Sequence, residues 1–129
     1  MFKRLLFLLA VTIFLTNCAF FEKTEPLAVA RVRFENASYY PVTNIRLKVD
    51  SIKEEVSCPE ISVAKDCYTD FPGQEHVGNL IIISWEQNGK SWTTGEISAE
   101  MPKTVKRDVP LTCSVSIGNQ GSYNTHFVQ

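Results

Sequence analysis

The chain has 129 residues, of which 44% are hydrophobic and 21% charged, and its 13 Lys and Arg against 14 Asp and Glu give a net charge of −1 at pH 7. This length is the ordinary size of one domain with one hydrophobic core. A charge so mild and so mixed in sign does not suggest nucleic-acid binding, which would call for a basic face, so we expect no nucleic-acid partner.

The first 18 residues have the pattern of an export signal. Lys3 and Arg4 precede an apolar run over residues 5–15, and small and polar residues follow it. As a helix this run would extend about 16 Å, which is about half the thickness of the hydrocarbon core of a bilayer. A charged start, a short apolar run and a processing site in that order are typical of a signal peptide.

The residues Leu15, Thr16, Asn17 and Cys18 resemble the lipobox of bacterial lipoproteins, in which a leucine three residues before a cysteine marks the cleavage site. Asn17 stands where that family usually has Gly, Ala or Ser. The resemblance implies lipidation of Cys18, with the domain outside the cytoplasm. Ala19, in place of the Asp that favours the inner membrane, implies the outer membrane facing the periplasm. The alternative is an uncleaved anchor over residues 5–21.

Three parts are therefore expected along the chain. They are a signal peptide over residues 1–17, the lipidated Cys18 with a tether over residues 18–28, and one folded domain over residues 29–129.

The first half of that domain alternates between apolar and polar residues, which is the period of a half-buried strand. Pro59 cannot donate a ladder hydrogen bond, so its segment is interpreted as an edge strand or a bend. Pro72 and Gly73 predict a turn that ends the fourth segment. The predicted strands cover residues 30–35, 43–50, 56–63 and 67–71.

The strongest structural signal lies between residues 80 and 97. Asn88-Gly89 predicts a two-residue type I′ hairpin turn, which places Trp85 opposite Trp92. We expect this hairpin to be central and covered on both sides. Its two faces are predicted to be Ile81 and Ile83 with Trp85, and Leu80 and Ile82 with Ile97.

Two further strands are predicted over residues 109–117 and 122–128, joined by a turn over residues 118–121. The total is seven or eight strands, with no helical period after Cys18. This pattern predicts an all-β domain, a single β-sandwich of antiparallel strands with the general shape of immunoglobulin or fibronectin type III domains. Such a shape hosts many unrelated functions.

Four cysteines are present, and lipidation would use Cys18. Cys58 and Cys67 are close in sequence and lie in an oxidising compartment, so we predict a disulfide between them, which would contribute about 2 to 3 kcal/mol. Cys113 would then be a buried thiol. The alternative is two bridges that include Cys18, although its position beside the apolar run makes such a bridge awkward.

No motif for catalysis, phosphate binding or a metal ion is present in the sequence. His76 and His126 have no nearby His or Cys at metal-ligand spacing. We therefore predict a protein that is not an enzyme and has no catalytic residues, metal or cofactor. The alternative is an enzyme or metal carrier whose residues converge from loops, for instance His76 with Asp70 and Glu75.

Trp85, Trp92 and Tyr123 are candidates for an aromatic surface that binds a sugar or a peptide, with core packing as the alternative. The basic cluster of Lys103, Lys106 and Arg107 is interpreted as a solvated loop.

These observations favour a membrane-anchored, non-catalytic module that binds another envelope protein. An assembly or pilot factor and a toxin-immunity or inhibitor protein fit equally. The strand near Pro59, or the last one, would be an edge able to accept a partner strand. The alternative function is a module that binds a solute or a glycan.

Overall fold

The computed structural model describes residues 28–50, 54–74, 80–106 and 108–129, so the predicted signal peptide, Cys18 and most of the tether lie outside the described residues. The described residues contain eight β-strands and no helix, which confirms the all-β prediction. None of them forms a helix long and apolar enough to cross a membrane. The strands are β1 (Val29–Asn36), β2 (Val42–Val49), β3 (Glu54–Ile61), β4 (Asp66–Gln74), β5 (Ile81–Gln87), β6 (Lys90–Ile97), β7 (Leu111–Ile117) and β8 (Tyr123–Val128).

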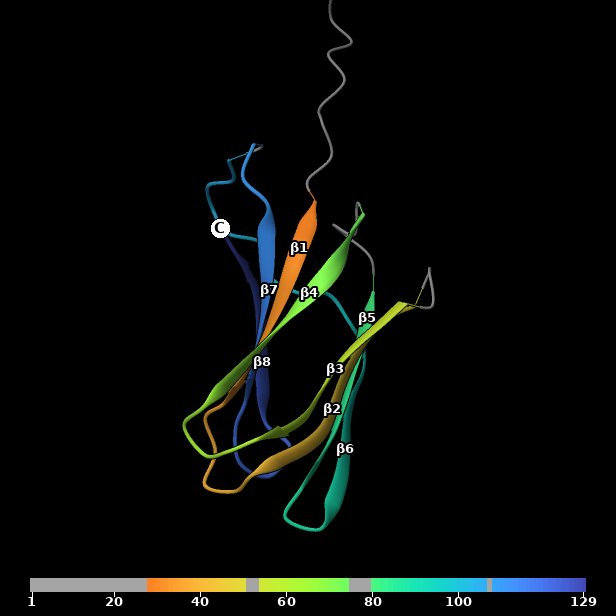
Figure 1. Cartoon of the computed structure of the whole chain (residues 1–129), viewed down its shortest axis with the longest axis vertical. Helices are drawn as coiled ribbons and strands as arrows, with labels where there is room; N and C mark the ends of the chain where they lie inside the picture. The colour runs from red at the N-terminus through yellow and green to blue at the C-terminus, as the bar shows by residue number, and fades with distance from the viewer. Residues whose placement is uncertain (1–27, 51–53, 75–79, 107) are drawn as a thin grey trace, which may run out of the picture.

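These strands form two four-stranded sheets that pack face to face, in the orders β4-β1-β7-β8 and β3-β2-β5-β6 (Figure 1). The prediction that all the strands would be antiparallel is wrong for one pair, because β1 and β7 run parallel. The two strands of a parallel pair are joined by a long connection and not by a hairpin turn, so no turn motif in the sequence predicts their pairing.

The predicted turn at Pro72-Gly73 is also wrong, because β4 continues through it to Gln74. Val29 pairs with Gln74 and Arg31 pairs with Asp70, so β4 has two more residues than β1 between these pairs. A bulge accommodates the extra residues, and the proline sits on an edge strand where its missing donor costs nothing in the ladder.

The β5–β6 hairpin has the predicted turn and register. Asn88 and Gly89 have φ values of 50° and 74°, and Trp85 pairs with Trp92. The prediction that the hairpin is central is wrong for β6, which is the edge of its sheet.

Ile97 also lies on a different face of this hairpin from the one predicted. Between the pairs Ser84–Thr93 and Ile82–Glu96, β6 has one more residue than β5, and Gly95 in this bulge has a φ of 68°. Since side chains alternate along a strand, one extra residue turns Ile97 to the face of Ile81, its partner.

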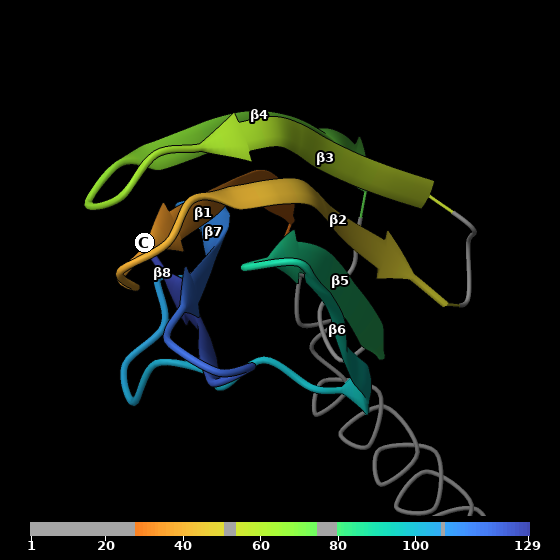
Figure 2. The same ribbon diagram turned by 90° about the horizontal axis from the view of Figure 1, so that it is seen from below.

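The core lies between the two sheets and is built from the inward side chains of both. The sheets come close together on the side of β3 and β4 and diverge toward β6 and β8, where the connection after β6 crosses between them (Figure 2). Cys58 of β3 and Cys67 of β4 form the predicted disulfide, which joins the two sheets along their closer side. The largest fully buried side chains are Trp85, Phe34, Ile45, Leu47, Ile61, Ile83, Leu111 and Ile117.

The two ends of the sandwich are formed by different connections between the strands. β1 begins at one end, beside the connection between β6 and β7, and the β1–β2, β3–β4, β5–β6 and β7–β8 turns lie at the other (Figure 1). We call the first the N-terminal end and the second the turn end.

Candidate functional site

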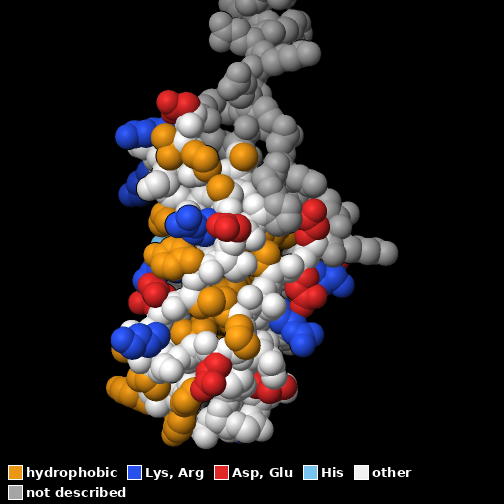
Figure 3. All heavy atoms as spheres, in the orientation of Figure 1, with side chains coloured by type: hydrophobic (Ala, Val, Ile, Leu, Met, Phe, Trp, Pro, Cys, Tyr) orange, Lys and Arg blue, Asp and Glu red, His pale blue; other side chains and the backbone are white. Residues whose placement is uncertain are grey.

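The turn end carries a group of exposed apolar side chains, Tyr39, Tyr40 and Val63, which we call the tyrosine surface. Their exposed fractions are 82%, 45% and 42%. The β1–β2 and β3–β4 loops that carry them are joined by backbone hydrogen bonds of Asn36, from its N–H to Lys65 O at 3.0 Å and from Ala64 N–H to its O at 3.1 Å. Hydrophobic side chains gather over these two loops in the space-filling view (Figure 3). Two loops distant in sequence thus form one surface.

A buried polar network lies directly beneath this surface and holds its shape. The side-chain amide of Asn36, which is fully buried, donates to Tyr40 O at 2.8 Å and to Ile61 O at 3.0 Å. Its Oδ1 accepts from the N–H of Ser38 at 3.0 Å and also from the Ser38 hydroxyl. Because buried polar groups are costly to leave unpaired, these bonds favour one conformation of the β1–β2 loop.

The network extends to the other two turns of the same end. Gln87, at the end of β5, donates from Nε2 to Ser38 Oγ at 2.6 Å and to Gly118 O at 3.2 Å. Asn119 in the β7–β8 turn accepts from the Tyr39 N–H at 2.9 Å. The tyrosine surface is therefore presented on a loop that is hydrogen-bonded to three neighbouring segments, which lowers the entropy that binding would cost.

Beside the tyrosine surface is a hollow of about 440 Å³ between the β5–β6 and β7–β8 turns. Lys90 Nζ is 6.0 Å from the ring centroid of Trp92, which is within the range of a cation–π contact. Within the described part of the chain, Gln87 Oε1 and Trp85 Nε1 are buried and have no hydrogen-bond partner. The hollow is lined by Tyr40, Gln87, Asn88, Lys90, Trp92 and Gln120.

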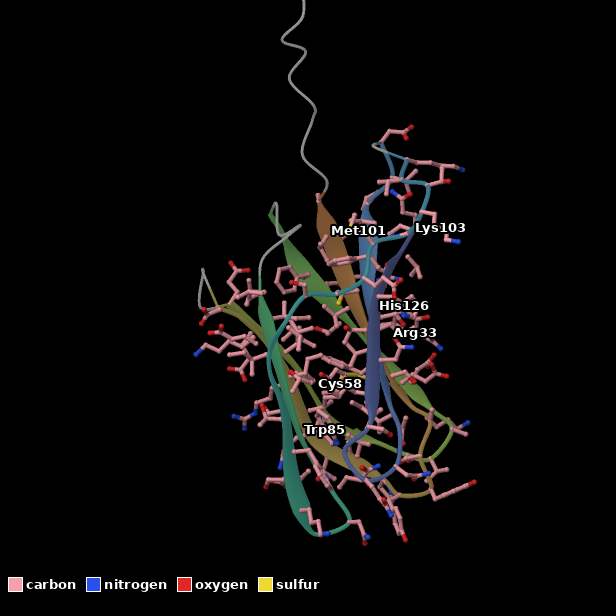
Figure 4. The ribbon with its side chains drawn as sticks, turned by 180° about the vertical axis from the view of Figure 1, so that it is seen from behind. Arg33, Cys58, Trp85, Met101, Lys103 and His126 are labelled. Atoms are coloured by element: carbon pink, nitrogen blue, oxygen red, sulfur yellow. A yellow bond between two sulfur atoms is a disulfide. The ribbon has the colours of Figure 1, made fainter. Side chains whose placement is uncertain are left out.

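The three aromatic residues singled out from the sequence do not form one open surface. Trp85 is 2% exposed and packs in the core (Figure 4), so it presents no face to a ligand. Tyr123 is exposed and meets Trp85 edge to face, with ring centroids 6.3 Å apart. Trp92 is half-buried and lines the hollow. Tyr123 and Trp92 thus remain available to a ligand, whereas Trp85 packs in the core against Tyr123.

The titratable groups considered for chemistry are dispersed. His126 is half-buried on β8 opposite Ser114, and Asp70 is exposed on β4, where Arg31 lies 3.8 Å away. His76 and Glu75 lie outside the described residues. In the described ranges no group of three or more His, Cys, Asp and Glu side chains could hold a metal ion.

Cys113 is a buried free cysteine between the sheets, as predicted. Burial raises the pKa of its thiol to about 12, because the thiolate would lose its hydration. The thiol is therefore protonated at neutral pH, and a protonated, buried thiol is a poor nucleophile.

The outer face of the sheet that contains β1 carries paired charges. Arg33 donates to Asp66 at 3.2 Å, and this hydrogen bond raises the pKa of Arg33. Tyr68 lies beneath two guanidinium groups, with ring centroid to Cζ distances of 5.5 Å for Arg31 and 5.9 Å for Arg33. Arg33 is half-buried and the other groups are exposed, and all of them are paired with one another, so this face is a hydrated surface of paired charges.

Sequence analysis did not single out Tyr39 and Tyr40, because they lie between the predicted strands over residues 30–35 and 43–50 and belong to neither. A signal was present, since two adjacent aromatic residues occupy a short connection between two half-buried strands. Large aromatic side chains in such a connection have no core to enter and therefore remain at the surface.

No protein-family model and no curated protein matches the chain. In fold it is similar to a protein from Eubacterium rectale whose structure was solved by NMR, with a TM-score of 0.51 and 11% sequence identity over 84% of this chain and 95% of that one. At this level of identity the similarity shows the two-sheet fold alone.

Proposed function

We propose that the chain is a non-catalytic protein-binding module, tethered to a bacterial envelope membrane through a lipid on Cys18, and that its partner docks on the tyrosine surface. An assembly or pilot factor and a toxin-immunity or inhibitor protein are the two versions of this function. We also propose that the sandwich is of the immunoglobulin or fibronectin type III kind. Its two face-packed four-stranded sheets support that assignment.

The observation that carries the proposal is the position of the tyrosine surface, at the opposite end of the sandwich from the start of β1 (Figure 1). Strands of eight residues extend about 26 Å at about 3.3 Å per residue. A domain tethered through its N-terminus thus holds Tyr39 and Tyr40 well clear of the anchor. Tyrosine is enriched at protein interfaces because its ring supplies a large contact area and a hydroxyl at low entropic cost.

The test is capture of a partner from detergent extracts of the source membranes with the tagged full chain. Y39A/Y40A is compared with Y68A, which removes an exposed tyrosine from a different face. We expect one protein recovered with both the wild type and Y68A, with its affinity reduced at least about tenfold by Y39A/Y40A, since central aromatic residues often dominate binding. Recovery of nothing but lipid, or equal recovery by both variants, would reject the tyrosine surface as the interface.

A second candidate function, binding of a solute or glycan, is supported by the hollow beside the surface. Amide side chains of Gln87, Asn88 and Gln120 can hydrogen-bond hydroxyl groups, and Trp92 can stack on a sugar ring. The test is a titration with N-acetylglucosamine oligomers followed by indole fluorescence, with W92F as the comparison. A saturable change in the wild type that W92F lacks would favour this function over protein binding.

A further inference from the structure

The connection between β6 and β7 covers residues 98–110. Its part after the β-bridge of Glu100 with His126, residues 101–110, is called the 101–110 loop and lies at the N-terminal end of the sandwich (Figure 1). The N–H of Leu111, directly after the loop, donates to the carbonyl oxygen of Ala28, the first described residue, at 2.9 Å. Met101 and Lys103 lie toward this end in the view that labels them (Figure 4). The loop is therefore a direct neighbour of the point where the tether joins the domain.

The loop is held in place by the side chain of Gln129. Gln129 Oε1 accepts from the Lys106 N–H at 2.7 Å, and its Nε2 donates to Lys106 O and, at 2.9 Å, to Val109 O. Val105 packs against the core from the same loop. These contacts fix the backbone while Met101, Lys103 and Lys106 remain exposed, and the exposed fraction of Met101 is 36%.

The charge of the loop is opposite to that of the rest of the domain. Within residues 101–110 the sequence has three cations and one anion, a net of two positive, with Arg107 outside the described residues. Elsewhere in residues 28–129 it has seven cations against eleven anions, a net of four negative. An anionic surface would attract the loop and repel the rest of the domain, so it would favour the orientation in which the loop faces that surface.

The length of the tether keeps the loop within reach of a membrane. Ala28 is ten positions after Cys18 in the chain, and ten peptide steps span at most about 35 Å. A lipid on Cys18 would hold the domain within that distance of the bilayer. Each lysine close to an anionic bilayer then adds to the attraction, which decays over about 8 Å at physiological salt.

We propose that the 101–110 loop rests on an anionic lipid surface through Lys103 and Lys106, and so orients the domain with the tyrosine surface facing away from the membrane. The inference depends on the lipid tether of the proposed function. Basic and hydrophobic side chains, with acidic atoms beside them, are seen together at this end of the domain (Figure 3).

The test is lysine footprinting of the processed full chain on vesicles of phosphatidylcholine with or without phosphatidylglycerol. We expect acetylation of Lys103 and Lys106 to be about fivefold slower on phosphatidylglycerol vesicles, and this protection to disappear in high salt. Lys48 and Lys65, which are exposed elsewhere on the domain, are the internal controls and should react equally on both vesicles.

A second readout uses Met101, the sole methionine outside the predicted signal peptide. Its oxidation by peroxide should slow on phosphatidylglycerol vesicles in the wild type and in K48E/K65E, but not in K103E/K106E. Chain that floats with the vesicles without protection of Lys103, Lys106 and Met101 overturns this inference alone. Chain that leaves the vesicles and has no acyl mass on Cys18 overturns the tether, and this inference with it.

Discussion

Reduction of the disulfide between Cys58 and Cys67 is expected to lower the free energy of unfolding by about 2.6 kcal/mol. The two cysteines are nine residues apart in the chain. Closing a loop of that size removes about 9 cal/mol/K of entropy from the unfolded chain, and this value at 25 °C gives the estimate above. Because the bond also joins the edges of two different sheets, its loss frees β3 and β4 to separate at their closer side.

The measurement is urea unfolding of the full chain with and without reductant, followed by the fluorescence of buried Trp85. In a domain of about 100 residues the predicted loss corresponds to a fall in melting temperature of about 10 to 20 °C. The oxidised form should also have the smaller dependence of unfolding free energy on urea, since its unfolded state is more compact.

The matched control is C58A/C67A, which should reproduce the loss and then be insensitive to reductant. C113V should keep the full response to reductant, because Cys113 takes no part in the bridge. A loss below about 0.5 kcal/mol on reduction would refute the reasoning, because the loop-closure entropy would then be absent or cancelled by strain in the folded state.

Three further changes test the structure at other points. N36D places a carboxylate against the carbonyl oxygens of Tyr40 and Ile61, so the free energy of unfolding should fall by about 3 kcal/mol or more in thermal unfolding. An unchanged melting temperature would contradict the buried network. G121A and G95A both place alanine at a positive φ, but only at Gly121 would the new Cβ lie 2.3 Å from the Trp92 ring. G121A should therefore lower the free energy of unfolding, measured in urea, by at least about 1 kcal/mol more than G95A does. Equal losses would refute that contact. For Cys113, the folded-state pKa of about 12 lies above the unfolded value of 9.0, so the contribution of this thiol to stability is complete below pH 9.0 and is lost as the pH rises toward 12. Between those limits the free energy of unfolding, measured in urea, should fall by about 1.4 kcal/mol per pH unit more in the wild type than in C113V. If the two proteins show the same dependence on pH, the thiol is accessible in the folded state.

The position of the candidate site was decided by tertiary contacts. Tyr39 and Tyr40 form a surface with Val63 because Asn36 bonds to the β3–β4 loop, and Gln87 ties the β1–β2 loop to the β7–β8 turn. The partners in this network are up to 80 residues apart. No periodicity or motif within a single segment reports a hydrogen bond of that range.

What the sequence determined by itself is local. Period-two alternation placed the strands, Asn88-Gly89 determined the turn and thus the pairing of Trp85 with Trp92, and the short spacing of Cys58 and Cys67 indicated their bridge. These features depend on residues within a few positions of one another, where steric and turn preferences act directly.

Only the tertiary structure decided the parallel pairing of β1 with β7, the edge position of β6 and the bulges that redirect Ile97 and extend β4. Each of these depends on which distant strand lies alongside, and several pairings bury an alternating strand equally well. The physical reason is that alternation specifies which face of a strand is apolar, whereas the neighbour that covers this face is selected by the packing of the whole core.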